Sequence, residues 1–142
     1  LTMKYTKDIN STIYQESLAI RKEVFMNEQQ VPLSIEVNDE DKCIHFVLYE
    51  DGVPQATVRL YPKSKDTFKI QRMAVLKSAR NKGFGQYIMT EAEKYAQKIG
   101  MTTLILGAQT HALSFYEKMG YKKFGDEYVV SKINHYNMKK TL

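Results

Sequence analysis

The sequence predicts one domain of the mixed α/β (α+β) class that spans residues 1–142, and three observations support this prediction. Strand-like and helix-like stretches follow one another in the order strand, helix, strands, helix, strand, helix, strands. A chain of 142 residues is long enough to bury one hydrophobic core. Its contents of 43% hydrophobic and 26% charged residues are ordinary for a globular protein.

The chain begins with a predicted strand and a predicted helix. Residues 3–7 form a short β-prone run. Thr12 and Gln15 have the spacing of a capping box, with a hydroxyl first and an amide three residues later, so a helix should begin here. Ile20 and Val24 follow at helical spacing, which predicts that one face of this helix packs on the core.

Residues 27–42 are acidic and less regular. Pro32 argues against one continuous helix through this stretch. We expect a solvated loop, with the alternative that one or two of its carboxylates line a pocket for a cationic substrate. The acidic residues are Glu28, Glu36, Asp39, Glu40 and Asp41.

Three consecutive antiparallel strands are predicted in the middle of the chain. Residues 43–50 and 53–61 are strand-like, and the Asp51-Gly52 pair between them is a strong hairpin signal. A second turn leads to a third strand at residues 67–76.

A glycine-containing loop at residues 80–85 separates the third strand from a predicted helix at residues 86–99. The loop contains two cationic residues and two glycines, Gly83 and Gly85. Glycine lets backbone N–H groups approach an anion, and a helix start adds unpaired N–H groups and the positive end of a dipole. The loop therefore predicts a phosphate or pyrophosphate site, with an ordinary strand-to-helix connection as the alternative.

The residues around this glycine pair argue against two common nucleotide-binding loops. A Walker A loop needs Lys followed by Ser or Thr after its last glycine, where this chain has Gln86-Tyr87. The dinucleotide fingerprint needs a third small residue where this chain has Ile88, and an acid after the next strand, where it has Leu106-Gly107.

The C-terminal part predicts one more strand, one more helix and a closing hairpin. Gly100 and Gly120 are suited to end the two C-terminal helices. The predicted elements are a strand at 102–106, a helix at 112–119, a hairpin of 121–124 with 128–133 around Gly125-Asp126, and an extension of the last strand over 135–139.

Composition limits the partners that we expect. The formal net charge of +5 suits an anionic ligand, but the lysines are scattered, so nucleic acid is not the leading partner. No run of 18 apolar residues predicts a membrane span, and the single cysteine fits a reducing, cytoplasmic setting. One cysteine and three scattered histidines make a poor metal set, so we expect no metal and read Cys43 and His45 as structural by default.

Two motifs resemble those of the GNAT superfamily of N-acetyltransferases. Arg80-x-x-Gly83-x-Gly85 after an apolar strand resembles the acetyl-CoA motif, and Phe115-Tyr116-Glu117-Lys118-Met119-Gly120-Tyr121 resembles the second signature. Their order and separation also match. Further residues resemble a bacterial subfamily of small, mostly uncharacterised GNAT proteins: Val24-Phe25, Glu28-Gln29, Val31-Pro32, Glu36, His45, residues 72–75, Ala108-Gln109-Thr110 and His135-x-x-Met138.

The resemblance implies a mostly antiparallel, twisted sheet of about six to seven strands with flanking helices, splayed at the strands ending near Val75 and Leu106. It implies acetyl-CoA as the co-substrate. The pantetheine arm would pair with Met73, Ala74 and Val75, and Gln109 stands where the family commonly has an Asn that contacts this arm. The pyrophosphate would bind the loop residues Arg80, Asn81, Lys82, Gly83, Phe84, Gly85 and Gln86.

The implied reaction is direct transfer of an acetyl group to a primary amine. Tyr116 occupies the position of the tyrosine that often protonates the departing CoA thiolate, and a phenol and a thiol have comparable acidity. The amine must lose a proton to a carboxylate or a histidine. Our candidates are Glu28, then Glu36, with His45 as a further one. In the subfamily an acid often follows Glu36 by two residues, and Asn38 replaces it here.

The sequence leaves the acceptor open. A small amine, an aminoglycoside-like molecule, a peptide N-terminus and a protein lysine are all compatible, and the acidic stretch favours a cationic small molecule. Homodimers are common in the superfamily, so a homodimer is compatible with the resemblance. Two other functions remain as alternatives: a CoA-binding regulatory module without turnover, and a nucleic-acid-binding protein driven by the charge of +5.

Overall fold

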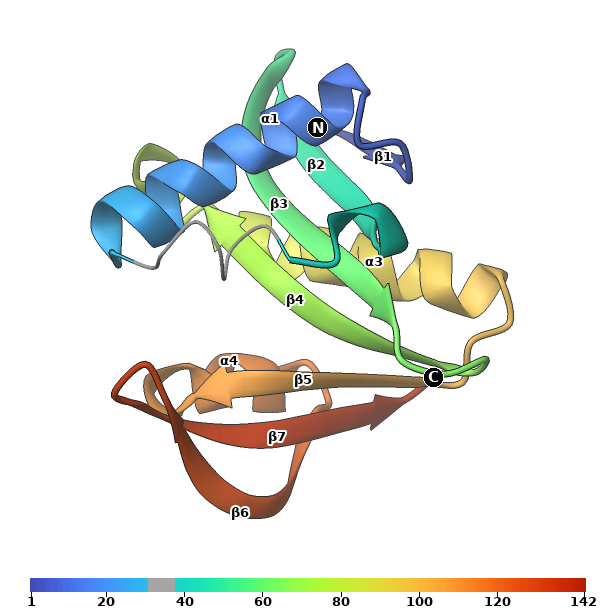
Figure 1. The fold of residues 1–142 in the computed structure, drawn as a ribbon, viewed down its shortest axis with the longest axis vertical. Helices are drawn as coiled ribbons and strands as arrows, with labels where there is room; N and C mark the ends of the chain where they lie inside the picture. The colour runs from blue at the N-terminus through green and yellow to red at the C-terminus, as the bar shows by residue number, and fades with distance from the viewer. Residues whose placement is uncertain (31–37) are drawn as a thin grey trace.

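Seven strands form one sheet in the order β1-β2-β3-β4-β5-β7-β6 (Figure 1). The computed structural model describes residues 1–30 and 38–142. The strands are β1 (Thr2–Thr6), β2 (Ile44–Glu50), β3 (Val53–Pro62), β4 (Thr67–Val75), β5 (Thr103–Gln109), β6 (Lys122–Val130) and β7 (Ile133–Thr141). The helical segments are α1 (Thr12–Arg21), η1 (Lys22–Glu28), η2 (Glu40–Lys42), η3 (Lys77–Ala79), α3 (Phe84–Lys98), η4 (Thr110–Ala112) and α4 (Leu113–Lys118). The predicted fold class is confirmed.

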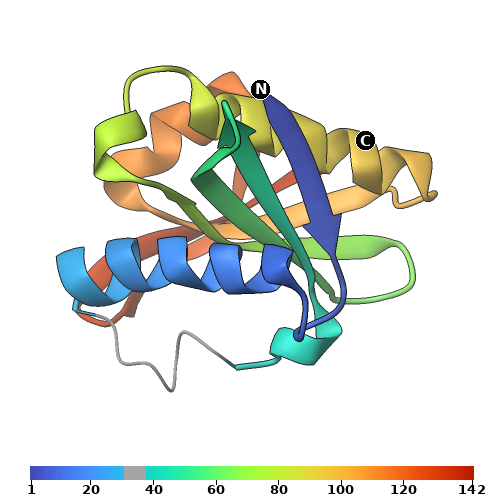
Figure 2. The same cartoon turned by 90° about the horizontal axis from the view of Figure 1, so that it is seen from above.

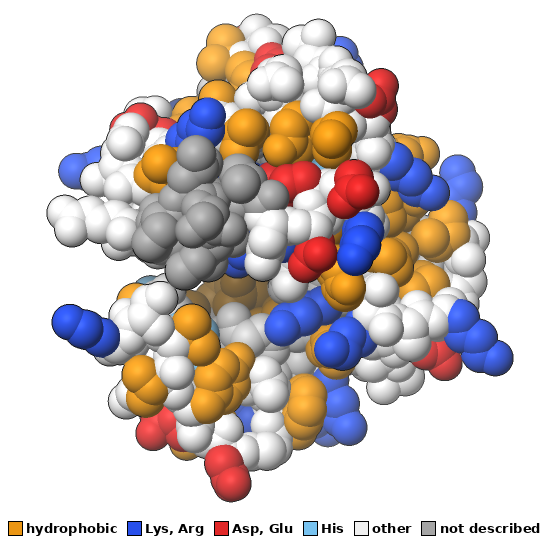
Figure 3. Space-filling model, viewed as in Figure 1, with side chains coloured by type: hydrophobic (Ala, Val, Ile, Leu, Met, Phe, Trp, Pro, Cys, Tyr) orange, Lys and Arg blue, Asp and Glu red, His pale blue; other side chains and the backbone are white. Residues whose placement is uncertain are grey.

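The sheet is antiparallel except where β4 meets β5. These two strands pair in parallel over three residue pairs, from Thr67 opposite Thr103 to Lys69 opposite Ile105. Beyond this point β4 runs on to Val75 along β3, and β5 runs on along β7, so the two strands diverge (Figure 1). In the space-filling view, the surface is hollowed on the side where β4 and β5 diverge. The hollow lies above the layer formed by β5, β7 and β6 (Figure 3).

Helices cover the two faces of the sheet unequally. Helix α1 lies on one face, and α3 and α4 lie on the other (Figure 2). The larger apolar core is on the side of α3, where Ile88 and Met89 pack with Phe46 and Leu104. A smaller core joins Ile20 and other residues of α1 and η1 to the opposite face of β2 and β4. Ile20 and Val24, which apolar periodicity had predicted to pack on the core, are both buried. Burial of such side chains supplies most of the driving force for packing.

A buried carboxylate links the two divergent parts of the sheet. Glu93, on α3, accepts a hydrogen bond from the Tyr121 hydroxyl at 2.6 Å and forms an ion pair with Lys140 of β7 at 3.1 Å. Tyr121 is fully buried, and burial together with this carboxylate raises the pKa of its phenol strongly. Helix α3 packs mainly on β2, β3 and β4. Glu93 therefore links that part of the sheet to Tyr121, which follows α4, and to Lys140 of β7.

Two local predictions were wrong. The N-cap of α1 is Ser11, whose hydroxyl accepts from the Tyr14 N–H, so the capping hydroxyl lies one residue before Thr12. The last hairpin turns at Ser131-Lys132, where both residues have positive φ (52° and 66°) as a two-residue type I′ turn requires. Gly125 lies instead within β6, where the register shifts between Phe124 and Tyr128, because a glycine in a strand also suits a bulge.

Candidate active site

The end of β4 presents a free backbone edge toward the divergent space. Opposite Val58, β4 carries two residues, Arg72 and Met73, and this bulge places Arg72 at φ 55°. From Ile70 to Val75, no described strand pairs with β4 on the side of β5. Peptide N–H and C=O groups on such an edge can pair with an extended ligand, as an added strand would.

The free edge leads into the start of α3. After η3, the chain reaches α3 through Asn81 at φ 66° and Gly83 at φ 79°, both left-handed. Gly83 is the N-cap residue, and no side chain of the described residues caps this helix end. The first N–H groups of α3 therefore point outward with the positive end of the helix dipole, an arrangement that fits a phosphate or pyrophosphate.

Gly85 lies where three elements of the candidate site meet. A Cβ added to Gly85 would lie 3.5 Å from Phe115 Cζ of α4 and 3.8 Å from Met73 Cε of β4. The first turn of α3, the end of β4 and the first signature residue of α4 are therefore in contact range of one another. This brings together Met73 and the loop residues, which the sequence had placed at one cofactor site.

Arg80 and Glu28 form an ion pair between the loop before α3 and the end of η1. Arg80 Nη2 lies 2.9 Å from Glu28 Oε1 and 3.0 Å from Oε2, and Arg80 Nε donates to the Val75 carbonyl at 3.0 Å. Glu28 is the last residue of η1, a π-helical segment that continues α1. The structure thus connects the loop, the end of β4 and the first choice for a catalytic carboxylate.

Tyr116 lies among aromatic rings on α4. Its ring meets Phe115 edge-on at a centroid distance of 5.0 Å and Tyr121 at 6.0 Å. Burial raises the pKa of Tyr116 to about 12, so the phenol holds its proton at neutral pH. A phenol that keeps its proton until negative charge develops beside it has the protonation state that a general acid requires.

Gln109 ends β5 and precedes η4. Its side-chain oxygen is hydrogen-bonded to His111 Nε2. The side chain is half-buried and lies at the divergent end of β5.

His45 lies in the interior rather than in an open cleft. It is 0% exposed, its Nε2 lies 2.9 Å from the Glu40 carbonyl oxygen, and burial lowers its pKa below the ordinary 6.5. This environment favours a structural role. Glu36, the other candidate carboxylate, lies outside the described residues.

A buried ion cluster, which the sequence did not predict, surrounds His45. Glu40 was expected in a solvated loop, but it is 7% exposed and pairs with Arg21 and Arg59, each at 2.8 Å. Tyr14 also donates to Glu40 at 3.0 Å, which helps to raise the pKa of that phenol to about 12. A carboxylate buried against two guanidinium groups is stable because its charge is compensated. In the sequence, the charged Arg59 within a predicted strand was the signal that could have indicated a buried ion pair.

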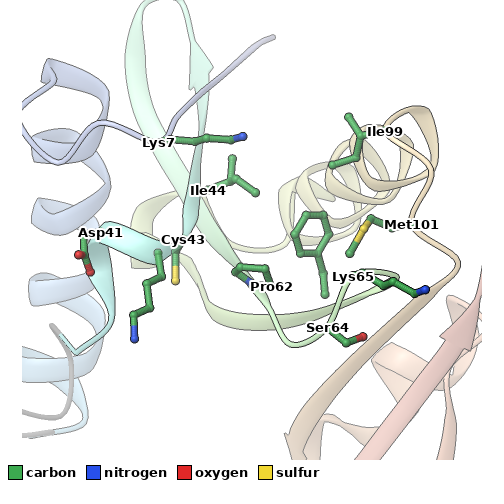
Figure 4. Close-up of a pocket in the computed structure, with 11 residues that line it drawn as sticks. Lys7, Asp41, Cys43, Ile44, Pro62, Ser64, Lys65, Ile99 and Met101 are labelled. Atoms are coloured by element: carbon green, nitrogen blue, oxygen red, sulfur yellow. The ribbon is translucent and has the colours of Figure 1, made fainter.

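A separate pocket lies at the other ends of β4 and α3. It has a volume of about 330 Å³ and is lined by Phe68 near the start of β4, Ile99 and Met101 after α3, and Cys43 beside η2 (Figure 4). It contains none of the candidate site residues. Among the described residues, no group of three or more His, Cys, Asp or Glu side chains could hold a metal ion. In the same part of the chain, no helix is long and apolar enough to cross a membrane.

The free edge of β4 and the open start of α3 together fit a ligand with an extended arm and a phosphate group. The family model described as an acetyltransferase (GNAT) domain matches residues 9–142. The chain belongs to this family and is an acyl-CoA-dependent N-acyltransferase.

Individual relatives agree with this assignment. The chain is 37% identical over 134 residues to an uncharacterized N-acetyltransferase, YjcF, of Bacillus subtilis (strain 168), covering 92% of this chain and 94% of the relative. It is 26% identical to an acyl-CoA N-acyltransferase from Pseudomonas aeruginosa, with a TM-score of 0.87 over 99% of both chains. A Bacillus subtilis acetyltransferase solved in complex with CoA shares the fold, with a TM-score of 0.69 at 18% identity, over 100% of this chain and 99% of that one.

Proposed function

We propose that the protein transfers the acetyl group of acetyl-CoA to a primary amine of a small-molecule or peptide acceptor in the cytoplasm. The observation that carries this proposal is the free edge of β4, which is followed, after η3 and a short loop, by the uncapped start of α3. An extended arm and a pyrophosphate on one molecule match these two features together, since each alone would suit many ligands.

In this proposal, backbone groups do most of the donor binding. The N–H groups from Arg80 to Gln86 hold the pyrophosphate, and the edge formed by Met73, Ala74 and Val75 pairs with the arm, with Gln109 on the opposite side. When bound, the thioester supplies an electrophilic carbonyl carbon. Backbone donors at the end of β4 polarise that carbonyl and stabilise negative charge on its oxygen.

Proton movements complete the reaction. The attacking amine forms the new C–N bond while the C–S bond breaks, and the amine loses one proton to a base. Tyr116 supplies a proton to the departing thiolate, and solvent later returns it. Its raised pKa means that the phenol gives up this proton only as negative charge develops on the sulfur beside it. Glu28 contacts a cationic acceptor, and its ion pair with Arg80 links this contact to the loop that binds the donor.

Two measurements test the proposed function. Acetyl-CoA at concentrations well above its dissociation constant should raise the melting temperature, because a ligand that binds only the folded state stabilises it. A panel of amines in a thiol-release assay should then reveal acceptors. The proposal is wrong if acetyl-CoA gives no shift. Stabilisation without thiol release from any amine would instead favour a CoA-binding regulatory module.

A further inference from the structure

The face of β5, β7 and β6 that lies opposite α4 carries a polar group of side chains that the donor site does not use. Met138 of β7 is in the core with α3, so the alternate residues His135 and Asn137 lie on the other face. In the β5–β7 ladder, His135 is paired with Gln109, and Asn137 is paired with Gly107. His135 is therefore next to Gln109, at the divergent end of β5 and on the face opposite α4.

Two contacts fix the ring of His135. Its Nδ1 lies 2.8 Å from the Ile133 carbonyl oxygen. A carbonyl oxygen only accepts, so Nδ1 carries the proton in the neutral ring and Nε2 carries the lone pair. The Tyr128 ring stacks on the imidazole at a centroid distance of 5.5 Å and an interplanar angle of 18°.

Tyr128 is itself held in place. Its hydroxyl donates to Asn137 Oδ1 at 2.9 Å. The hydroxyl also lies directly over Gly107, where an added Cβ would collide with it. A glycine at this point of β5 is therefore required for Tyr128 to cross the strand and support His135.

The other candidate bases of the described chain are engaged differently. His45 is fully buried, with Nε2 facing a backbone carbonyl. His111 uses Nε2 in its contact with Gln109. The Glu28 carboxylate is paired through both oxygens with Arg80. Within the described residues, no hydrogen bond occupies Nε2 of His135.

We propose that His135 is the base that accepts the proton of the acceptor amine. This inference rests on the proposed function. The amine nitrogen forms a bond to the acyl carbon, the C–S bond breaks, and the N–H proton moves to His135 Nε2, from which solvent removes it. Tyr128 is a positioning residue, because its ring and hydroxyl keep the imidazole oriented without touching the acceptor.

The test compares His135→Ala and His135→Gln with the exposed neighbour Asn134→Ala in the thiol-release assay. We expect both His135 variants to lose about 10²–10⁴-fold in kcat/KM for the amine. Added imidazole should restore part of the activity of His135→Ala, because it can fill the space left by the ring, and should leave His135→Gln and Asn134→Ala unchanged. Melting temperature and its increase with CoA should stay near wild type in all three variants.

The outcomes separate this inference from the proposed function. If the wild-type protein turns over and His135→Gln is equally active, His135 is not the base. The acetyltransferase proposal then still stands. A lost activity that imidazole does not restore, accompanied by a lowered melting temperature, also overturns the role of His135 as the base, in favour of a structural role. Absence of turnover in the wild-type protein with every amine overturns both. Tyr128→Phe, which keeps the stacked ring, should retain more activity than Tyr128→Leu.

Discussion

Arg80 Nη2 contacts both carboxylate oxygens of Glu28, at 2.9 and 3.0 Å, while Arg80 Nε donates a hydrogen bond to the Val75 carbonyl. The two side chains come from segments 52 positions apart in the chain. The sequence had assigned them to different tasks, Arg80 to the pyrophosphate and Glu28 to the acceptor. Their contact means that either residue can influence both sides of the reaction.

Glu28→Gln should therefore change donor binding as well as turnover. We expect a higher KM for acetyl-CoA and a change of less than about 1 kcal/mol in the free energy of unfolding, because the pair is partly exposed and solvent screens it. Kinetics of Glu28→Gln, Arg80→Gln and the double variant measure the coupling. Strictly additive effects on kcat/KM would show that the two residues act independently.

Gly83→Ala should weaken donor binding beyond its effect on stability. Gly83 has φ +79° with nothing within 4 Å, and Gly52 in the β2–β3 turn has the same φ and the same open surroundings. An alanine in this left-handed conformation costs about 1–2 kcal/mol at either position. Gly52→Ala is therefore a matched control: urea unfolding should show similar losses, but only Gly83→Ala should raise the dissociation constant for CoA. Equal CoA affinities of the two variants would contradict the assignment of the loop.

Tyr116→Phe should slow the reaction more than it weakens donor binding. The phenol proton is lost while the ring contacts with Phe115 and Tyr121 remain. Loss of a general acid lowers kcat by roughly 10²-fold or more. Because the pKa of Tyr116 is raised to about 12, wild-type activity should not fall through ionisation of this residue below pH 10 or so. An unchanged kcat in Tyr116→Phe would remove the residue from the acid role.

Stability should fall in mild acid because of His45. Its folded-state pKa lies below the ordinary 6.5, so the unfolded chain binds more protons as the pH drops below that value. The stability of the folded state with neutral His45 is fully present above pH 6.5. It falls as the pH approaches the lowered pKa, by no more than about 1.4 kcal/mol per pH unit for one proton. Arg21 and Arg59 facing the ring oppose its charging, whereas Glu40 favours it.

Urea unfolding at several pH values between about 7 and 5 measures this slope. His45→Gln, which does not titrate, should be less stable overall but should show a flatter dependence on pH in this window. His111→Gln replaces an exposed histidine with the same side chain and is the matched control. A wild-type slope in His45→Gln would assign the acid sensitivity to other groups.

Tyr121→Phe should destabilise the junction between the two parts of the sheet. The variant removes the hydrogen bond to the buried Glu93 carboxylate, and bonds to charged groups are worth about 1.5–3 kcal/mol. Tyr136→Phe removes a hydroxyl that makes no hydrogen bond within the described residues, so it serves as the matched control. If Tyr121→Phe lowers the free energy of unfolding no more than Tyr136→Phe does, the contact between Tyr121 and Glu93 does not link the two parts of the sheet.

Patterns within single segments were reliable in the sequence. The Asp51-Gly52 turn, the buried face of α1 and the loop before α3 follow from local chemistry, and the structure contains all of them. The last hairpin was misplaced because Ser131-Lys132 is an unusual composition for a type I′ turn, whereas Gly125 is a common one.

Contacts between distant segments could not be predicted in the same way. The burial of Glu40 depends on Arg21 and Arg59 arriving from two other elements. The stacking of Tyr128 on His135 depends on where the hairpin turns, because a turn at Gly125 would have put the two residues out of register. Such relationships are set by tertiary packing, which a single sequence does not display.

The three-pair contact between β4 and β5 also sets the length of the free edge of β4. The free edge runs from Ile70 to Val75, which at about 3.3 Å per residue is roughly 20 Å of strand. Lys69 and Ile105, the last paired residues, limit this edge at one end, and Val75 limits it at the other. If the arm of acetyl-CoA pairs with this edge as proposed, the length of the edge limits the donors that fit, so we expect the protein to distinguish donors by the length of their arm.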